Sequence, residues 1–397
     1  ANPPPALRPT PPKRGLLEMT TNIKSMKIAH VVATFPPDIG GMGQMAEGEA
    51  REMVKRGHEV TVFALSYPYS HYDDTALKHI KIVRSRPLIP GGAAGWVPAW
   101  RKQLAGFDLI HLHYPFYGGA ESVWLNSGKV PYIITYHMDA QPTALFKKPI
   151  KLIYDRFLAP YIIRGARRVI LVDDNHSFSL DKKISSSQKV LLPNGIDIGI
   201  FSPGVVSPNE FGLDKLVGKD LFLFVGNFLS VKGLPLLIKA WNKLSDNQAH
   251  LLVVGGGHSE SSYKKLAEKF GVADRIHWQG PCYDKNRLAK YYRLAAAVII
   301  PSFSESFSLV AGEALASGCP VIASDVPGIR GRVKDGKTGF LFESGAERGL
   351  IDALEKFMRL STAERAGLGS AGRELIVKEF SLKKHTDLLE EVYSGSV

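Results

Sequence analysis

Short apolar runs alternate with amphipathic patterns along the first half of the chain. A run at residues 26–33 precedes a glycine-rich turn, a helical pattern that continues to Arg56, and a second run at 57–63. Later strand candidates lie at residues 108–112, 132–135 and 169–172, and the segment 189–197 closes this half. Strands that alternate with helices predict an α/β fold, in which helices cover both faces of a parallel sheet.

The second half repeats the alternation. Its strand candidates lie at residues 221–225, 249–254, 275–279, 298–300 and 320–323. We therefore predict two Rossmann-like domains, at residues 26–200 and 201–380, whose binding faces meet across a cleft. The proline-rich segment 1–25 is expected to be disordered, or a leader added for expression, and is left out of the fold.

Composition narrows the class of protein. The chain has 397 residues, enough for two cores, and 45% hydrophobic and 22% charged residues, as in soluble globular proteins. No apolar run approaches the roughly 20 residues that span a bilayer. The net charge of +12 indicates an anionic partner, either a substrate or a membrane surface. We expect no nucleic-acid binding, because zinc-finger spacing and RNA-binding aromatic motifs are missing. Scarce cysteine suggests the cytoplasm.

The most informative segment is residues 301–316. It follows a buried strand, so Glu305 should lie in the turn at the carboxyl end of that strand, with Glu313 two helical turns further on. The start of a helix attracts anions, whereas a carboxylate accepts hydrogen bonds from hydroxyls. A ligand with hydroxyls at both ends and phosphate between them fits this arrangement, and a nucleotide-sugar is such a ligand.

This segment resembles the paired-glutamate motif of retaining glycosyltransferases of the GT-B fold, specifically the large fourth family. The resemblance implies a hexosyl transfer from a nucleotide-diphosphate sugar to a hydroxyl, without cofactor or metal. It also implies that the helix at residues 381–397 returns to the first domain. At the donor, it assigns ribose binding to Glu313 and further contacts to Phe307, Ser308 and Leu309.

Other donor contacts follow from the same resemblance. Lys232 is expected to hold the diphosphate. Where the family usually has an arginine, this chain has Asn227. Either another basic group compensates, with Arg330 and Arg332 as candidates, or the leaving group is stabilised less. The remaining assignments are backbone approach at Gly41 and cleft shape at Gly255. Tyr283 ends the segment that reads the base in the family, and it is either a residue that stacks on the base or a surface tyrosine.

Residues 135–139 read Thr-Tyr-His-Met-Asp and resemble the family segment whose histidine contacts the transferred sugar. His137 and Glu305 are therefore assigned to positioning and electrostatics. The resemblance also implies a front-face displacement, in which the departing phosphate helps to deprotonate the acceptor hydroxyl. We expect His111 and His113 to point to opposite faces of a strand, so that no zinc ligands converge.

The acceptor is the least determined part. Residues 146–158 and 161–168 combine long apolar side chains with basic residues, including Lys147, Lys148 and Lys151. They predict either helices resting on an anionic membrane, with a lipid-linked or glycan acceptor on its cytoplasmic face, or a core-packed amphipathic helix. One alternative is a disaccharide or disaccharide-phosphate synthase with a soluble acceptor. Another is a non-catalytic scaffold, suggested by Asn227.

Overall fold

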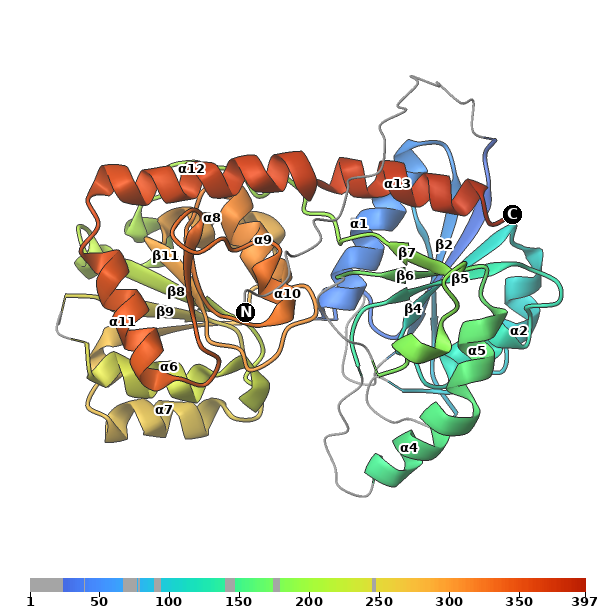
Figure 1. The fold of residues 1–397 in the computed structure, drawn as a ribbon, viewed down its shortest axis with the longest axis horizontal. Coiled ribbons are helices and arrows are strands. Elements are labelled where there is room, and N and C mark those ends of the chain that lie inside the picture. Colours follow the sequence, from blue (N-terminus) through green and yellow to red (C-terminus); the bar gives the residue numbers. More distant parts are fainter. Residues whose placement is uncertain are drawn as a thin grey trace, which may run out of the picture.

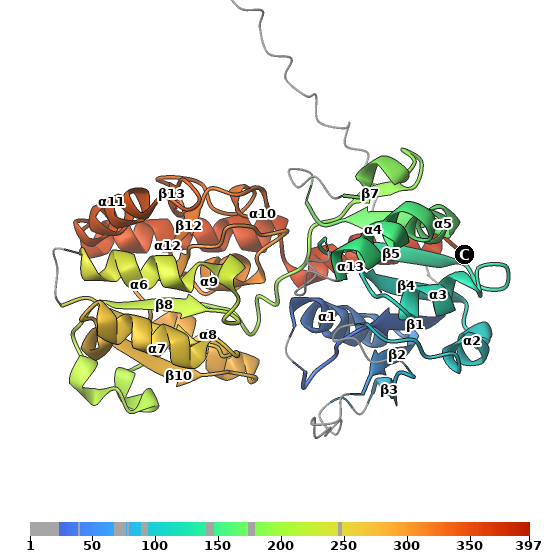
Figure 2. The same cartoon turned by 90° about the horizontal axis from the view of Figure 1, so that it is seen from below.

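A computed structural model describes residues 24–38, 40–66, 77, 79–88, 94–139, 147–173, 179–244 and 248–397. The side chains of Lys147, Lys148 and Ile150, which include two of the predicted membrane lysines, lie outside the described part. The chain forms two lobes, each built around a parallel sheet and joined along one side by the last two helices (Figures 1 and 2).

The first lobe contains a sheet that runs, over the described residues, in the order β3-β2-β1-β4-β5-β6-β7. Its strands are β1 (Lys27–Val32), β2 (Glu59–Leu65), β3 (Lys81–Ser85), β4 (Leu109–Tyr114), β5 (Tyr132–Tyr136), β6 (Arg168–Leu171) and β7 (Lys189–Leu191). The helices are α1 (Gly41–Lys55), α2 (Trp100–Gln103), α3 (Gly119–Trp124), α4 (Lys147–Phe157) and α5 (Ala159–Gly165). Every residue of β4 is buried, as expected for the centre of a parallel sheet covered on both faces.

The second lobe repeats this plan with the strand order β10-β9-β8-β11-β12-β13 among its described residues. Its strands are β8 (Leu221–Val225), β9 (His250–Val254), β10 (Ile276–Gly280), β11 (Ala297–Ile300), β12 (Val321–Ser324) and β13 (Gly339–Phe342). Its helices are α6 (Leu234–Asn242), α7 (Glu260–Lys269), α8 (Lys285–Leu294), α9 (Leu309–Ala316), α10 (Pro327–Arg330) and α11 (Glu347–Met358).

The predicted α/β class is confirmed, and so is the alternation of strand and helix. Three strands were not predicted as strands, β3, β7 and β13, and each lies at the edge of a sheet. β3 has four half-buried residues and one exposed residue, so it lacks the continuous apolar run of a central strand. β7 is likewise half-buried or exposed, whereas β13 is an apolar run of four residues, as long as the predicted β6, β11 and β12, and was overlooked.

Two long helices connect the lobes. α12 (Thr362–Glu379) lies along the second lobe, and α13 (Leu382–Ser394) continues across to the first, where it packs against α1 (Figure 1). Arg56 of α1 donates to Glu390 over 2.7 Å and to Asp387 over 2.6 Å. Because the residues between the helices also bond to Ile196, the end of the chain is fixed to the lobe in which it began.

Candidate active site

The lobes are separated by a cleft of about 650 Å³. The first lobe contributes side chains of α1, among them Glu47 and Arg51, and the second contributes Tyr283, Leu309 and Glu313. Lys285 of α8 donates to Glu47 over 2.7 Å and so bridges the two lobes. The cleft therefore contains three of the predicted donor contacts, on the second-lobe side.

The first residues of α1 and α9 lie close together beside this cleft. A Cβ placed on Gly41 would lie 3.4 Å from Leu309 Cδ1. Ser308 precedes α9 with φ of 57°, and its buried Oγ has no hydrogen-bond partner among the described residues. Helix starts carry free N–H groups and partial positive charge. The place where Gly41 meets Leu309 is therefore suited to an anion such as a diphosphate.

Lys232 and Glu305 are brought together by two loops of the second lobe. Lys232 Nζ lies 2.7 Å from Glu305 Oε1, and Ser302 donates to the same oxygen over 2.8 Å. The loops approach closely at Gly233, which has φ of 71° and where a Cβ would lie 1.9 Å from the carbonyl oxygen of Pro301. The Glu305 side chain is 10% exposed and that of Lys232 is 30% exposed, so the cation faces solvent more than its partner does.

Glu313 is a buried carboxylate on the cleft side of α9. Tyr292 donates to its Oε2 over 2.8 Å. Burial raises the pKa of Glu313 to about 7, while the Tyr292 hydrogen bond and the positive charge of Lys285 act in the opposite direction. Ligand hydroxyls that donate to this carboxylate would therefore favour its ionised form.

Three further residues that were predicted on the donor side, Gly255, Asn227 and Arg330, have different surroundings. Gly255 has φ of 148°, and a Cβ there would lie 1.9 Å from the carbonyl oxygen of Gly226, so its role is close backbone packing. Asn227 is exposed. Arg330 is held by Asp325 through two hydrogen bonds.

Arg332 is the more suitable of the two predicted compensating cations. Its guanidinium stacks 3.6 Å from the centre of the Phe307 ring and lies 3.4 Å from Asp173 of the first lobe. Glu305 also lies close enough to act on the pKa of Arg332, which burial lowers to about 10. Phe307 therefore supports a buried cation beside Glu305.

His137 follows β5 and is 6% exposed. Burial lowers its pKa to about 4, so the imidazole is neutral at pH 7. Its Nε2 lies 3.0 Å from Nδ1 of His113, and its Nδ1 has no hydrogen-bond partner among the described residues. A neutral imidazole in this state can offer Nδ1 to a ligand hydroxyl or phosphate oxygen.

Comparison with known proteins decides the family. Residues 39–199 match the family described as Glycosyltransferase Family 4, and residues 208–375 match Glycosyl transferases group 1. The D-inositol 3-phosphate glycosyltransferase of Frankia alni is 30% identical over 385 residues, which cover 85% of this chain and 90% of that protein. The chain belongs to the group 1 glycosyltransferases. A Mycobacterium tuberculosis (strain F11) enzyme with the same name is 28% identical and covers 91% of the chain.

Solved structures place this glycosyltransferase in the GT-B fold, as predicted. The sucrose-phosphate synthase of Thermosynechococcus elongatus superposes with a TM-score of 0.76 at 23% identity, over 93% of this chain and 98% of that one. Anabaena HepE, solved with UDP and glucose, superposes with a TM-score of 0.75 at 18% identity, over 93% and 100% of the two chains. At these identities the likeness concerns the fold alone.

One prediction about the first lobe of the glycosyltransferase is wrong. His111 and His113 do not point to opposite faces of β4, because residues two apart on a strand share a face. Their rings stack with centroids 4.3 Å apart. The register of the parallel sheet sets His30 of β1 beside His111, and Glu49 of α1 approaches all three histidines. Potential metal ligands therefore do converge.

Several residues of the site were not predicted from the sequence. Lys285 and Tyr292 lie on α8, outside any family motif that we identified, and reach the cleft only because α8 packs beside α9. Glu49 could have been found, since α1 must bury one face against β1 and a carboxylate on that face needs a partner.

Proposed function

We propose that this glycosyltransferase moves a hexosyl group from a nucleotide-diphosphate sugar to a hydroxyl acceptor with retention of configuration. The observation that carries the proposal is the Lys232–Glu305 pair beside the start of α9, with Glu313 further along the same helix. It combines a cation and free N–H groups for a diphosphate with two carboxylates for hydroxyls.

In this proposal each side chain acts on a different part of the donor. Glu313 accepts hydrogen bonds from the ribose hydroxyls. Lys232 stabilises the negative charge that develops on the diphosphate as the glycosidic bond breaks. Glu305 and the neutral His137 orient the hexose. The leaving phosphate removes the acceptor proton, so no protein nucleophile is needed. No metal is needed at the diphosphate either, because Lys232 and the starts of α1 and α9 supply positive potential there.

We propose a soluble phosphorylated sugar or polyol as the acceptor. Support comes from relatives named D-inositol 3-phosphate glycosyltransferase, one of them 30% identical over 85% of this chain. The first-lobe wall of the cleft carries two basic side chains, Arg51 and Lys55, which are paired with Glu47 and Glu52 of the same wall. An acceptor phosphate would replace these carboxylates as their partner. An enzyme that uses nucleotide-sugars and a phosphorylated metabolite would work in the cytoplasm.

A second candidate is an acceptor presented at an anionic membrane. Four large apolar side chains of α4 and α5 are 60% to 71% exposed rather than packed in the core: Leu152, Ile153, Phe157 and Tyr161. Arg156 and Arg164 lie on the same two helices. Lys151 contributes less than its sequence suggests, because it is paired with Asp155. No helix among the described residues is long and apolar enough to cross a membrane.

Incubation with a panel of nucleotide-sugars tests the proposal. Each donor is combined with inositol phosphates, hexose phosphates or lipid-linked sugars, and the released nucleotide and the product are measured together. Nucleotide release that requires a soluble phosphorylated acceptor supports the first reading. Transfer to lipid-linked acceptors alone, lost in a Leu152→Ser/Phe157→Ser variant but not in the exposed control Val205→Ser, supports the second. The absence of transfer with every pair contradicts both.

A further inference from the structure

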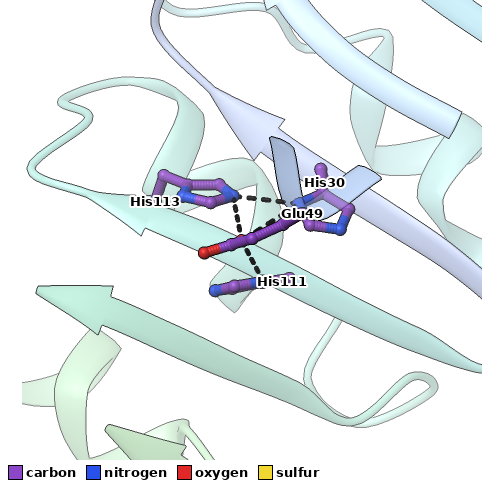
Figure 3. Close-up of side chains that lie close together, drawn as sticks. All are labelled: His30, Glu49, His111 and His113. Atoms are coloured by element: carbon purple, nitrogen blue, oxygen red, sulfur yellow. Dashed lines mark hydrogen bonds and ion pairs between the residues drawn. The ribbon is translucent and has the colours of Figure 1, made fainter. Parts of the chain in front are cut away.

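Four buried side chains meet inside the first lobe, away from the cleft lining. They are His30 of β1, Glu49 of α1, and His111 and His113 of β4, and Figure 3 shows them gathered around the Glu49 carboxylate. All four are 0% exposed. Each offers one nitrogen or oxygen, and these four atoms lie within 4.8 Å of one another.

Within the described part of the chain, the carboxylate oxygen at the centre has no hydrogen-bond partner. Glu49 Oε2 lies 3.5 Å from His111 Nδ1, 3.8 Å from His113 Nε2 and 3.9 Å from His30 Nδ1. It has no hydrogen-bond partner among the described residues, although its Oε1 is held by His385. A buried carboxylate oxygen without a donor is costly, and three imidazole nitrogens surround it. A cation between these atoms would satisfy it.

We propose that His30, Glu49, His111 and His113 bind one divalent transition-metal ion, with zinc the best match. Zinc takes histidine and carboxylate ligands in a tetrahedron. Bonds of 2.0–2.1 Å imply ligand atoms about 3.4 Å apart. Four of the six separations between these atoms are 3.0 to 3.9 Å, on either side of this value, and all six are within 4.8 Å, so the ligands have to draw slightly closer together around an ion. The His111 and His113 rings, now 27° from parallel, have to turn so that their nitrogens aim at the ion.

The outer atoms of the four ligands are already held. In proteins that bind metals, such partners fix the orientation of each ligand. The pairs are His30 Nε2 with Tyr393 Oη at 3.3 Å, His111 Nε2 with Thr135 Oγ1 at 2.7 Å, His113 Nδ1 with His137 Nε2 at 3.0 Å, and Glu49 Oε1 with His385 Nε2 at 3.0 Å. Two contacts inside the cluster would be given up, His30 to His113 at 3.0 Å and His111 to Tyr393 at 2.8 Å.

The four protein ligands would leave no open position, which is the arrangement of a structural site rather than a catalytic one. The ion would join β1, β4 and α1, and through Tyr393 and His385 it would support the docking of α13. It is separate from the diphosphate, for which we propose no metal. Through His113 it would also fix His137 as the acceptor at Nε2, which leaves the proton on Nδ1.

The direct test uses the full chain without a histidine tag. The protein is stripped with a chelator, dialysed, and titrated with Zn²⁺ and with Co²⁺, whose visible absorption reports tetrahedral coordination. We expect one ion per chain by elemental analysis, a tetrahedral cobalt spectrum, and a melting temperature that rises on loading. A wild-type chain that binds no stoichiometric metal and shows no change in melting temperature overturns the proposal and leaves a purely hydrogen-bonded histidine network.

Variants locate the ion. Glu49→Gln and His113→Gln should lose stoichiometric binding, and Thr135→Val, which removes only an outer partner, should weaken it about 10- to 100-fold. The matched control is His277→Gln, which breaks another histidine pair, 3.1 Å from His250 Nδ1 in the second lobe. His277→Gln should bind metal as the wild type does. If the cluster variants and the control retain metal equally, the ion binds elsewhere and the proposal is wrong.

Discussion

Lys232 and Glu305 form an ion pair, with 2.7 Å between Nζ and Oε1. Our proposal assigns these two side chains to different parts of the donor, the lysine to the diphosphate and the glutamate to the hexose. Each side chain therefore already has a charged partner before the donor binds. When the donor binds, the ion pair breaks, and the donor's phosphate and hydroxyl groups take the place of the two partners. Breaking the ion pair reduces the net free energy gained on donor binding. The lysine charge then stabilises the diphosphate as the glycosidic bond breaks.

Lys232→Ala should lower turnover more than it lowers donor affinity. A hydrogen bond to a charged group contributes about 1.5–3 kcal/mol, so we expect a ten- to hundred-fold loss in kcat. Lys264→Ala, which removes an exposed lysine paired with Glu260 on α7, is the control and should leave kcat unchanged. Steady-state kinetics over a range of donor concentrations separate the two parameters. A tolerated Lys232→Ala together with a requirement for a divalent metal would refute our account of the leaving group.

Glu313→Gln should weaken nucleotide binding ten- to hundred-fold, because two ribose hydroxyls lose a charged acceptor. The wild type should bind more tightly as pH rises from 6 to 8, because the pKa of Glu313 is raised to about 7 and only the ionised form accepts both hydroxyls. Calorimetry with the nucleoside diphosphate measures both effects. Equal affinity in the variant, or the same pH dependence in both proteins, would remove Glu313 from the ribose site.

The same group affects stability with the opposite sign. The folded chain keeps a proton on Glu313 between its usual pKa of 4.5 and about 7, whereas the unfolded chain has lost it. The free energy of unfolding therefore falls as pH rises through this window, by about 3 kcal/mol from this carboxyl. Chemical denaturation between pH 5 and 8 should show a flatter profile for Glu313→Gln than for the wild type. An identical profile would contradict the raised pKa.

Asn227→Arg should keep or raise activity, because it restores the cation that the family usually has at this position. Asn227 is exposed, so the longer side chain has room to adjust. The nearby arginines already have partners: Arg330 is hydrogen-bonded to Asp325, and Arg332 stacks on Phe307 and pairs with Asp173. Initial rates at saturating donor measure the effect. A clear loss of activity would mean that Arg332 already fills the role and repels the new charge.

Gly255→Ala should destabilise the second lobe by more than Gly271→Ala. Both glycines have positive φ, 148° and 65°, so both substitutions strain the backbone. Nothing lies within 4 Å of a Cβ at Gly271, whereas at Gly255 it would lie 1.9 Å from a carbonyl oxygen. We expect about 1 kcal/mol for Gly271→Ala and at least 2 kcal/mol for Gly255→Ala. Thermal unfolding of the two variants gives the comparison, and equal melting temperatures would refute this role of Gly255.

The sequence was sufficient for the central strands because they form long apolar runs with turns between them. It did not reveal β3 or β7, because edge strands with half-buried or exposed residues need no apolar run; β13 does form one and was overlooked. The motif at residues 301–316 located Glu305 and Glu313, because the two glutamates are close together in the sequence. Arg332 was one of two candidates from the sequence, and its choice over Arg330 depends on packing against Phe307; Lys285 depends on how the lobes pack, which no local pattern encodes.

The histidines show a different kind of error. Residues two apart on a strand share a face, and this rule could be applied to the sequence of β4. The prediction instead put His111 and His113 on opposite faces. Their convergence with His30 also needs the order of the strands, in which β1 lies beside β4. Contributions from α13, such as Tyr393, come from nearly 300 residues away along the chain and could not be inferred locally.

The central claim is retaining hexosyl transfer from a nucleotide-sugar. Its most direct test is the anomeric configuration of the first product, measured by proton NMR while the donor that the panel selects is being consumed. We predict that an α-linked donor gives an α-glycoside, with one nucleoside diphosphate released per glycoside formed. A β-glycoside from the same donor, or nucleotide release without a glycoside, would contradict the account.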